Sequence, residues 1–145
     1  MDTTTALREA IESALVKVPQ KDRKEVVKKS CQRTFQALRI DVNSEFEVLY
    51  SFLEKLPTVL KPGGRVAILT FHSGEDRLVK QSFKELKKAG IYSDVAKDVV
   101  RPSAEECRRN GRARSTKMRW AIRSDKKYFF AEYKYQNGTV RGEKI

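Results

Sequence analysis

The sequence predicts an α/β fold, because an amphipathic helix, a tight turn and an apolar strand follow one another directly. Leu49, Leu53 and Leu56 recur with helical spacing. Residues 61–64, Lys-Pro-Gly-Gly, then make a turn. Residues 65–71 form an apolar run without alternation, which is typical of a strand covered on both faces, as in a parallel sheet. Helix, turn and buried strand in this order form half of an α/β unit.

Further elements are expected on both sides of this unit. Thr3, Thr4 and Thr5 offer N-cap oxygens for the first helix, which ends at Pro19. The helix before the turn starts with a capping box of Ser44 and Glu47. A helix following residue 72 ends near Gly90. The later elements are predicted as a strand at 95–100, a helix at 103–110 with a capping box of Ser103 and Glu106, strands at 118–123 and 128–135, and a hairpin turn at Asn137-Gly138.

Length and composition narrow the class of protein. A chain of 145 residues with 39% hydrophobic residues suffices for one globular domain. No apolar run is long enough to span a membrane, and the first residues do not resemble a secretory signal. The two cysteines, Cys31 and Cys107, are far apart, so we expect free thiols and no metal site. These features predict a cytoplasmic or organelle-matrix protein without a membrane partner.

The charge of the chain is strongly basic and uneven. The net charge is +12, and residues 101–127 hold ten Lys and Arg against three Asp and Glu. Seven of those ten are Arg, whose guanidinium fork suits phosphate. We favour a nucleic-acid partner over a merely soluble lysine-rich surface. Residues 20–33 are basic as well, and a solvated helical face is favoured there over a second contact patch.

The segment after the apolar strand is the best local candidate for chemistry. Ligands gather at the carboxyl ends of strands in open α/β sheets, and polar side chains fill this segment. One interpretation is that His72, Ser73, Glu75 and Asp76 orient a polar substrate. The other is that the segment merely begins a helix, with acidic groups at its positive end. The residues alone leave both open, whereas a Ser-His-Asp hydrolase is disfavoured because adjacent residues rarely form a triad.

Two other groups of polar residues are candidates for binding. Arg112, Arg114 and Ser115 follow a glycine and suit a phosphate clamp, which we favour over a plain exposed loop. Arg33, Arg39 and Asn43 alternate with apolar residues that resemble core contacts. Either a ligand-touching loop or a helix junction explains these three.

Three segments together resemble the ribosomal RNA small-subunit methyltransferase H family, also called MraW-like. They are Arg33-Thr34-Phe35-Gln36-Ala37-Leu38-Arg39-Ile40-Asp41-Val42-Asn43, Leu60 to Lys80 with His72-Ser73-Gly74-Glu75-Asp76-Arg77, and Arg101 to Arg119 with Asn110-Gly111-Arg112-Ala113-Arg114-Ser115. The resemblance covers roughly residues 3 to 123 and corresponds to the C-terminal part of the family. Where the family usually has Leu, this chain has Gly74.

The resemblance implies a partial Rossmann-like methyltransferase fold. Residues 1–30 would be the end of an inserted helical domain, 31–123 the C-terminal part of the methyltransferase domain, and 124–145 an unassigned extension. It implies S-adenosylmethionine as methyl donor and the N4 amine of a cytidine in small-subunit ribosomal RNA as target. The cytidine side would be lined by Arg33, Arg39, Asn43, His72, Ser73, Glu75 and Asp76, and RNA phosphate would be held by Arg112, Arg114 and Ser115.

The family's glycine-rich cofactor loop has no counterpart in this sequence. Gly63-Gly64 precedes the strand instead of following it. We therefore expect a partial copy that binds S-adenosylmethionine weakly or not at all and is inactive alone. The alternatives are a non-catalytic RNA-binding or ribosome-associated module derived from the same fold, or a remnant without independent activity.

Overall fold

The computed structural model describes residues 3–130, and the chain divides into two compact units. The first unit is Met1–Glu45 and the second is Phe46–Ile145. The first unit consists of α1 (Thr4–Ala14) and α2 (Gln20–Asn43). The predicted domain boundary at residue 30 falls inside α2. Within the described residues, no helix is long and apolar enough to cross a membrane.

The two helices of the first unit are joined by a turn that Arg23 holds in place. The Thr3 hydroxyl caps α1 by accepting from the N–H of Ala6 at 3.1 Å, as predicted. The prediction that α1 runs to Pro19 is wrong, because α1 ends at Ala14 and Pro19 stands directly before α2. The Arg23 guanidinium donates to the Val18 carbonyl at 3.1 Å, which ties α2 back to this turn.

The junction after α2 also differs from the prediction. Ser44 adopts a left-handed conformation, with φ 50°, and its N–H bonds the carbonyls of Asp41 and Ile40. It therefore closes α2 instead of capping the next helix, so the predicted box of Ser44 and Glu47 is wrong. A residue that must complete a helix end with positive φ cannot also adopt the extended backbone of an N-cap.

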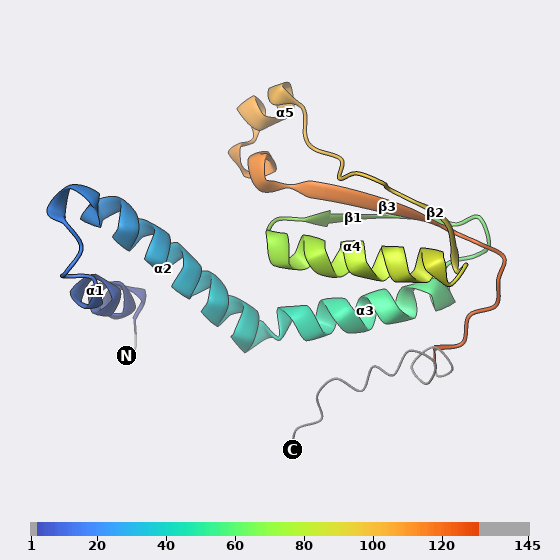
Figure 1. Cartoon of the computed structure of the whole chain (residues 1–145), viewed down its shortest axis with the longest axis horizontal. Helices are drawn as coiled ribbons and strands as arrows, with labels where there is room; N and C mark the ends of the chain where they lie inside the picture. Colours follow the sequence, from blue (N-terminus) through green and yellow to red (C-terminus); the bar gives the residue numbers. More distant parts are fainter. Residues whose placement is uncertain (1–2, 131–145) are drawn as a thin grey trace, which may run out of the picture. The chain divides into compact units, whose positions relative to one another are not determined.

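The second unit contains a three-stranded sheet in the order β1-β3-β2 (Figure 1). The strands are β1 (Arg65–Thr70), β2 (Tyr92–Val95) and β3 (Lys117–Arg123). The central β3 runs antiparallel to both neighbours, so β1 and β2 are parallel to each other. The helices are α3 (Glu45–Val59), α4 (Ser73–Lys88), α5 (Ala104–Arg109) and the 3₁₀ turn η1 (Gly111–Ser115).

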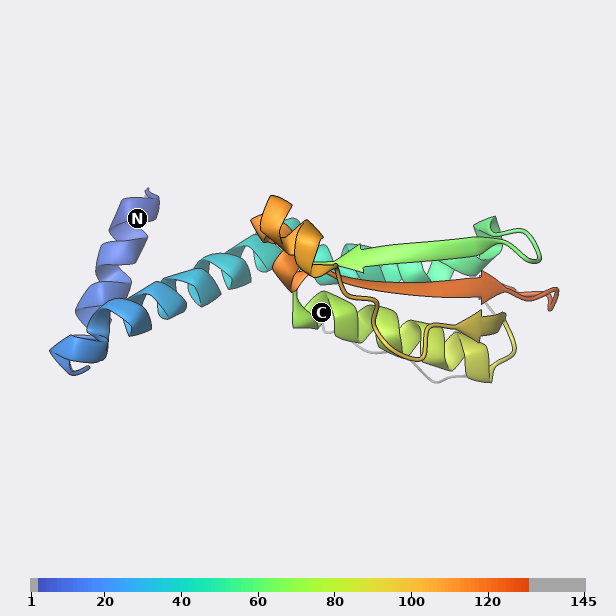
Figure 2. The same cartoon turned by 90° about the horizontal axis from the view of Figure 1, so that it is seen from above.

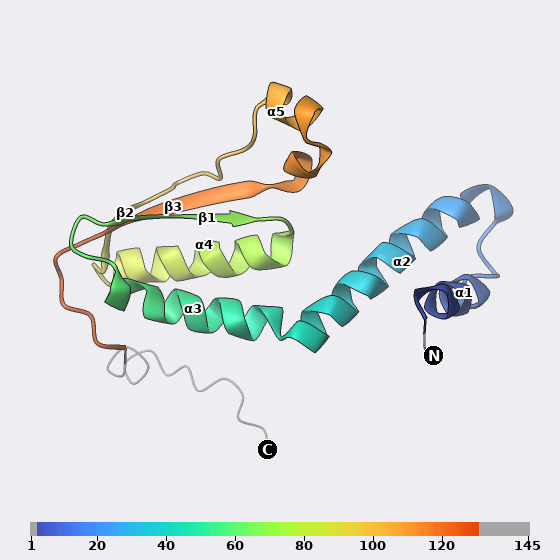
Figure 3. The same cartoon turned by 180° about the vertical axis from the view of Figure 1, so that it is seen from behind.

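The helices α3 and α4 lie on the same side of the sheet (Figures 1 and 3). Their apolar residues and the inward side chains of the strands form one core, against which Val66 and Ile68 of β1 also pack. The buried members are Leu53, Leu56, Val79, Phe83, Leu86, Ile91, Tyr92 and Ala121. The fold class predicted from sequence, a partial methyltransferase-type α/β fold, is confirmed.

The other face of the sheet carries no described helix, which corrects the prediction of a strand buried on both sides. β1 alternates between exposed and covered residues, and Leu69 is 59% exposed. β1 is also an edge strand among the described residues, with β3 as its one neighbour (Figure 2). Trp120 of β3 is only half-buried, because it alternates along the strand with the buried Arg119 and Ala121.

The turn before β1 is joined to the end of β3. Gly63 has a φ of 75°, and its N–H donates to the Arg123 carbonyl at 2.8 Å. The buried Arg123 guanidinium donates to the carbonyls of Pro57 and Ile91 at 3.0 and 3.1 Å. One arginine thus satisfies backbone carbonyls in the last turn of α3 and directly before β2, where burial without partners would be costly.

Several late elements differ from their predicted bounds. β2 precedes the strand expected at 95–100, where only an isolated bridge joins Val100 to Met118. The capping of α5 by Ser103, which accepts from the N–H of Glu106 at 3.1 Å, is confirmed. Residues 128–130 form no strand. The rest of the strand predicted at 128–135, and the turn at Asn137-Gly138, lie outside the described residues.

Candidate functional site

The register of the sheet brings two of the predicted segments to the same end of the second unit. Thr70, the last residue of β1, pairs with Lys117, the first residue of β3. The loop that begins α4 therefore starts beside the point where η1 leads into β3, as Figure 1 shows. The carboxyl end of β1 thus lies next to the arginine-rich segment, although the two are more than 30 residues apart in sequence.

His72 caps α4 with one ring nitrogen, and its other ring nitrogen is buried. Its Nδ1 accepts from the N–H of Glu75 at 3.4 Å, a cap supplied by an imidazole instead of a hydroxyl or carboxylate. An accepting Nδ1 places the proton of the neutral ring on Nε2. Nε2 has no hydrogen-bond partner among the described residues and lies 3.4 Å from a carboxylate oxygen of Glu75. The ring is thus oriented by the helix and can donate from its other nitrogen.

Glu75 and Gly74 fix the loop around this histidine. A Glu75 carboxylate oxygen accepts from the N–H of Phe71 at 3.0 Å, which completes a capping arrangement. Phe46 meets the His72 ring edge-on, with centroids 5.8 Å apart. A Cβ at Gly74 would approach Phe46 to 2.8 Å and the His72 Nδ1 to 3.1 Å. Glycine at this position therefore allows the two rings to approach the helix start.

Asp76 forms a buried ion pair with Arg119. Its two oxygens accept from Arg119 Nε at 2.7 Å and Nη2 at 3.1 Å, while the Lys117 ammonium lies 3.9 Å away. Asp76 is 8% exposed and Arg119 7% exposed. Hydrogen bonding from Arg119, together with its charge, lowers the pKa of Asp76 below the ordinary value, against the opposing effect of burial. The pair joins α4 to β3, and sequence reasoning missed Arg119 because nothing in its spacing indicated a partner.

The η1 turn presents its arginines to solvent. The Asn110 side chain accepts from the N–H of Arg112 at 3.1 Å, and the Ser115 hydroxyl lies 3.5 Å from the Arg112 carbonyl. Ala113 is buried, whereas Arg112 and Arg114 on either side of it are exposed. A short turn anchored by one small residue thus holds two guanidinium groups outward, which suits contact with phosphate.

The remaining predicted residues lie on α2, in the first unit. Arg39 and Asn43 both contact Glu45: Arg39 Nε is 3.0 Å and Asn43 Nδ2 3.4 Å from the same carboxylate oxygen. Arg33 is exposed. The neighbouring apolar residues expected to be core contacts are partly exposed, with Leu38 at 46% and Val42 at 79%. The binding roles of Arg33, Arg39 and Asn43 stay predictions, as do those of His72, Ser73, Glu75, Asp76 and the η1 residues.

The second unit has a partial α/β fold of the methyltransferase type. The model of the MraW methylase family matches residues 1–124. The chain belongs to this family.

Individual relatives agree with this assignment. Over 86% of its length, the chain is 73% identical to a ribosomal RNA small subunit methyltransferase H 1 of Lachnoclostridium phytofermentans, and the match covers 34% of that relative. Over 85% of its length, it is 71% identical to the same-named protein of Agathobacter rectalis, and the match covers 35% of that relative. A ribosomal RNA small subunit methyltransferase H of Kosmotoga olearia is 47% identical over 85% of the chain and 40% of the relative. The chain thus spans roughly a third of the length of the relatives it matches most closely among these.

Proposed function

We propose that this chain supplies the RNA-facing, substrate-side part of a small-subunit ribosomal RNA methyltransferase that acts on the N4 amine of a cytidine. The pairing of Thr70 with Lys117 carries the proposal, because it sets the His72 loop beside the exposed arginines of η1. A base near His72 and a phosphate at Arg112 and Arg114 would then belong to one bound strand. The chain would act where ribosomes assemble, in the cytoplasm or an organelle matrix.

The described residues do not fit the methyl donor, S-adenosylmethionine. A glycine after a strand holds a cofactor when its missing side chain leaves room for the ligand. Gly74 is the glycine that follows β1, and the space beside it is filled by Phe46 and His72. Gly63 and Gly64 precede β1 and form the turn that joins it to Arg123. We therefore assign donor binding to a separate part of the enzyme.

The surface available for that part is the edge of β1 and the open face of the sheet. Leu69 and Phe71 are 59% and 57% exposed there. An unpaired strand edge beside apolar side chains favours the addition of further strands and a covering layer. The first two relatives named above are almost three times as long as the matched segment. A docked cofactor-binding part would complete the sheet and bring the donor to the carboxyl end of β1.

Within such an enzyme, the residues of this chain would bind and orient the base. His72 Nε2–H would donate to an acceptor on the cytosine ring, and the capped start of α4 would keep the ring in place. Methyl transfer to an exocyclic amine is a direct displacement, so alignment of the two reactants supplies much of the rate. The base must leave its stack to reach the site, and arginine contacts to the flanking phosphates would hold the strand while it does.

The test compares the chain alone with the chain supplemented by the rest of the Lachnoclostridium phytofermentans relative. We expect the chain alone to bind small-subunit RNA, but neither to bind S-adenosylmethionine in calorimetry nor to transfer methyl groups. The supplemented mixture should methylate a cytidine at N4, and Arg112→Ala with Arg114→Ala should reduce that activity. Tight stoichiometric binding of the donor by the chain alone, with methyl transfer, would contradict the division of the site.

A non-catalytic RNA-binding module is the second candidate, and the charge of +12 favours it. It predicts salt-dependent binding of RNA that the supplement leaves unchanged, with no methyl transfer in the mixture. The same experiment therefore separates the two candidates.

A further inference from the structure

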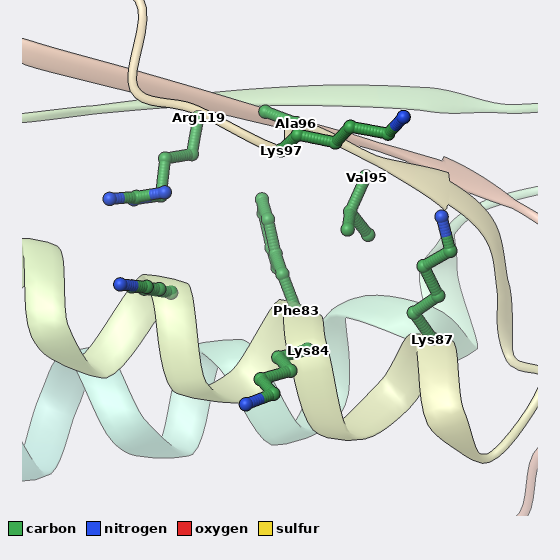
Figure 4. Close-up of a pocket in the computed structure, with 8 residues that line it drawn as sticks. Phe83, Lys84, Lys87, Val95, Ala96, Lys97 and Arg119 are labelled. Carbon is green, nitrogen blue, oxygen red and sulfur yellow. The ribbon is translucent and has the colours of Figure 1, made fainter.

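A cavity lies between α4 and β2, and Arg119 is its one lining residue that the candidate site described above also includes. It has a volume of about 260 Å³ and opens to solvent between the helix and the edge of the sheet (Figure 4). The Phe83 ring rises from α4 into this space and faces Val95, and Ala96 lies above it. The other lining residues are the basic side chains Lys80, Lys84, Lys87, Lys97 and Arg119.

The charge around this cavity is only partly neutralised. Arg119 is paired with Asp76, and Lys87 with Asp94 at 2.9 Å. Lys80, Lys84 and Lys97 form no ion pair with the residues that the structure describes. Within the described part of the chain, these three ammonium groups therefore have no counter-ion at ion-pair distance, although Lys80 interacts at longer range with Asp76 and Lys97 with Asp94. In Figure 4, Lys84 comes from the helix side and Lys97 from the strand side, and their ammonium groups point in different directions, which suits an extended ligand better than one small ion.

The combination of an apolar floor and a cationic rim defines the class of ligand. A lysine face that serves solubility alone needs no cavity beneath it. A nucleotide unit has the matching chemistry, because its base can cover the half-buried Val95 and Ala96 beside the buried Phe83 ring, while its phosphates meet the lysines. A free inorganic phosphate would leave the apolar floor exposed.

The position of the cavity separates it from the surface assigned to the donor-binding part. β1 and β2 are the two outer strands of the described sheet. A part that docks on β1 would leave the cavity beside β2 open. The cavity also lies along α4 beyond its first turn, whereas His72 and η1 lie where α4 begins.

We propose that the α4–β2 cavity is an auxiliary RNA site, in which Lys80, Lys84 and Lys97 hold phosphates of a single-stranded segment and the apolar floor at Val95 and Ala96 receives one base. The identity of the ligand as RNA rests on the proposed function, whereas the cavity and its charge do not. The site increases affinity for the substrate and takes no part in the transfer.

The test measures binding of a short single-stranded RNA to the full chain at several salt concentrations. Replacement of Lys80, Lys84 and Lys97 by Gln should weaken binding about tenfold or more at low salt and lower the slope of log affinity against log salt by about 2, at ~0.7 per lost contact. The matched control replaces the exposed Lys55, Lys61 and Lys127 by Gln, which removes the same charge outside the cavity. A third variant, Ala96→Trp, fills the floor, and should weaken binding with the salt slope unchanged.

Equal losses in the cavity triple variant and its control would overturn the auxiliary site. So would full affinity in a folded Ala96→Trp variant, or binding of inorganic phosphate as tightly as a cytidine mononucleotide. Failure of the supplemented chain to transfer methyl groups would remove the proposed function but not this site. If RNA binding were lost in the Arg112→Ala, Arg114→Ala variant but unchanged in the cavity variants, the auxiliary site would be removed and the proposed function would stand.

Discussion

At the scale of single residues, the Asp76–Arg119 pair is the most consequential interaction in the second unit. Both residues are nearly buried and joined by two hydrogen bonds. Asp76→Asn would leave the guanidinium charge buried without its counter-charge, so we expect a loss of about 3–5 kcal/mol in unfolding free energy, measured by urea denaturation. The double variant Asp76→Leu with Arg119→Met replaces both charges by apolar groups and should recover most of the loss. An Asn variant as stable as the parent would contradict this.

The same pair predicts how stability depends on pH. The folded pKa of Asp76 is lowered, chiefly by the hydrogen bond from Arg119. Its contribution is therefore complete above the ordinary Asp pKa of about 3.9 and is lost as the pH falls through the lowered folded value. The difference in urea midpoint between the parent and Asp76→Asn should shrink over that range. A difference in urea midpoint that stays constant down to pH 2 would show that protonation of the Asp76 carboxylate is not linked to unfolding.

At the scale of elements, His72 combines the start of α4 with a candidate ligand contact, and two variants separate these roles. Asn is a good N-cap, so His72→Asn should keep thermal stability near that of the parent while removing the Nε2–H donor. His72→Ala removes both and should cost about 0.5–2 kcal/mol. In the supplemented enzyme, methyl transfer should then fall equally in both variants. If activity follows stability instead, His72 serves only to begin the helix.

The elements also show how much of the fold can be predicted from the sequence. The helix spacing of Leu49 to Leu56, the Pro-Gly-Gly turn and the apolar run at 65–71 predicted α3, the turn and β1 correctly, because local pattern determines them. The partner of each strand is not a local property. Whether both faces of β1 are covered, and whether Trp120 points into the core, depend on which layers pack on the sheet. Ser44 was misread because its backbone completes α2, whereas its side chain suits a cap.

The candidate site could likewise be predicted only as far as local sequence patterns determine it. The sequence indicated the polar loop after β1 and the arginines of η1, since both carry residue types suited to the predicted chemistry. Their adjacency follows from the register of β1 and β3, which no local pattern contains. The basic cavity was missed because Lys80, Lys84 and Lys97 look like an ordinary solvated helix face and an isolated loop lysine. Only the packing of Phe83 against Val95 reveals a floor between them.

At the scale of the second unit, an open apolar sheet face should make the isolated chain associate. Leu69 and Phe71 are exposed on β1 and directly after it, and burying such a surface is favourable. We expect concentration-dependent association in sedimentation velocity, abolished by Leu69→Lys with Phe71→Lys at little cost in stability, because both side chains are already solvated. Val59→Lys, also at an exposed position, is the matched control and should still associate.

The lysine pair should also prevent the donor-binding part from docking, so the supplemented mixture loses methyl transfer while the chain keeps its RNA affinity. Full methyl transfer by the lysine-pair variant would mean that the proposed donor-binding part does not pack on this face.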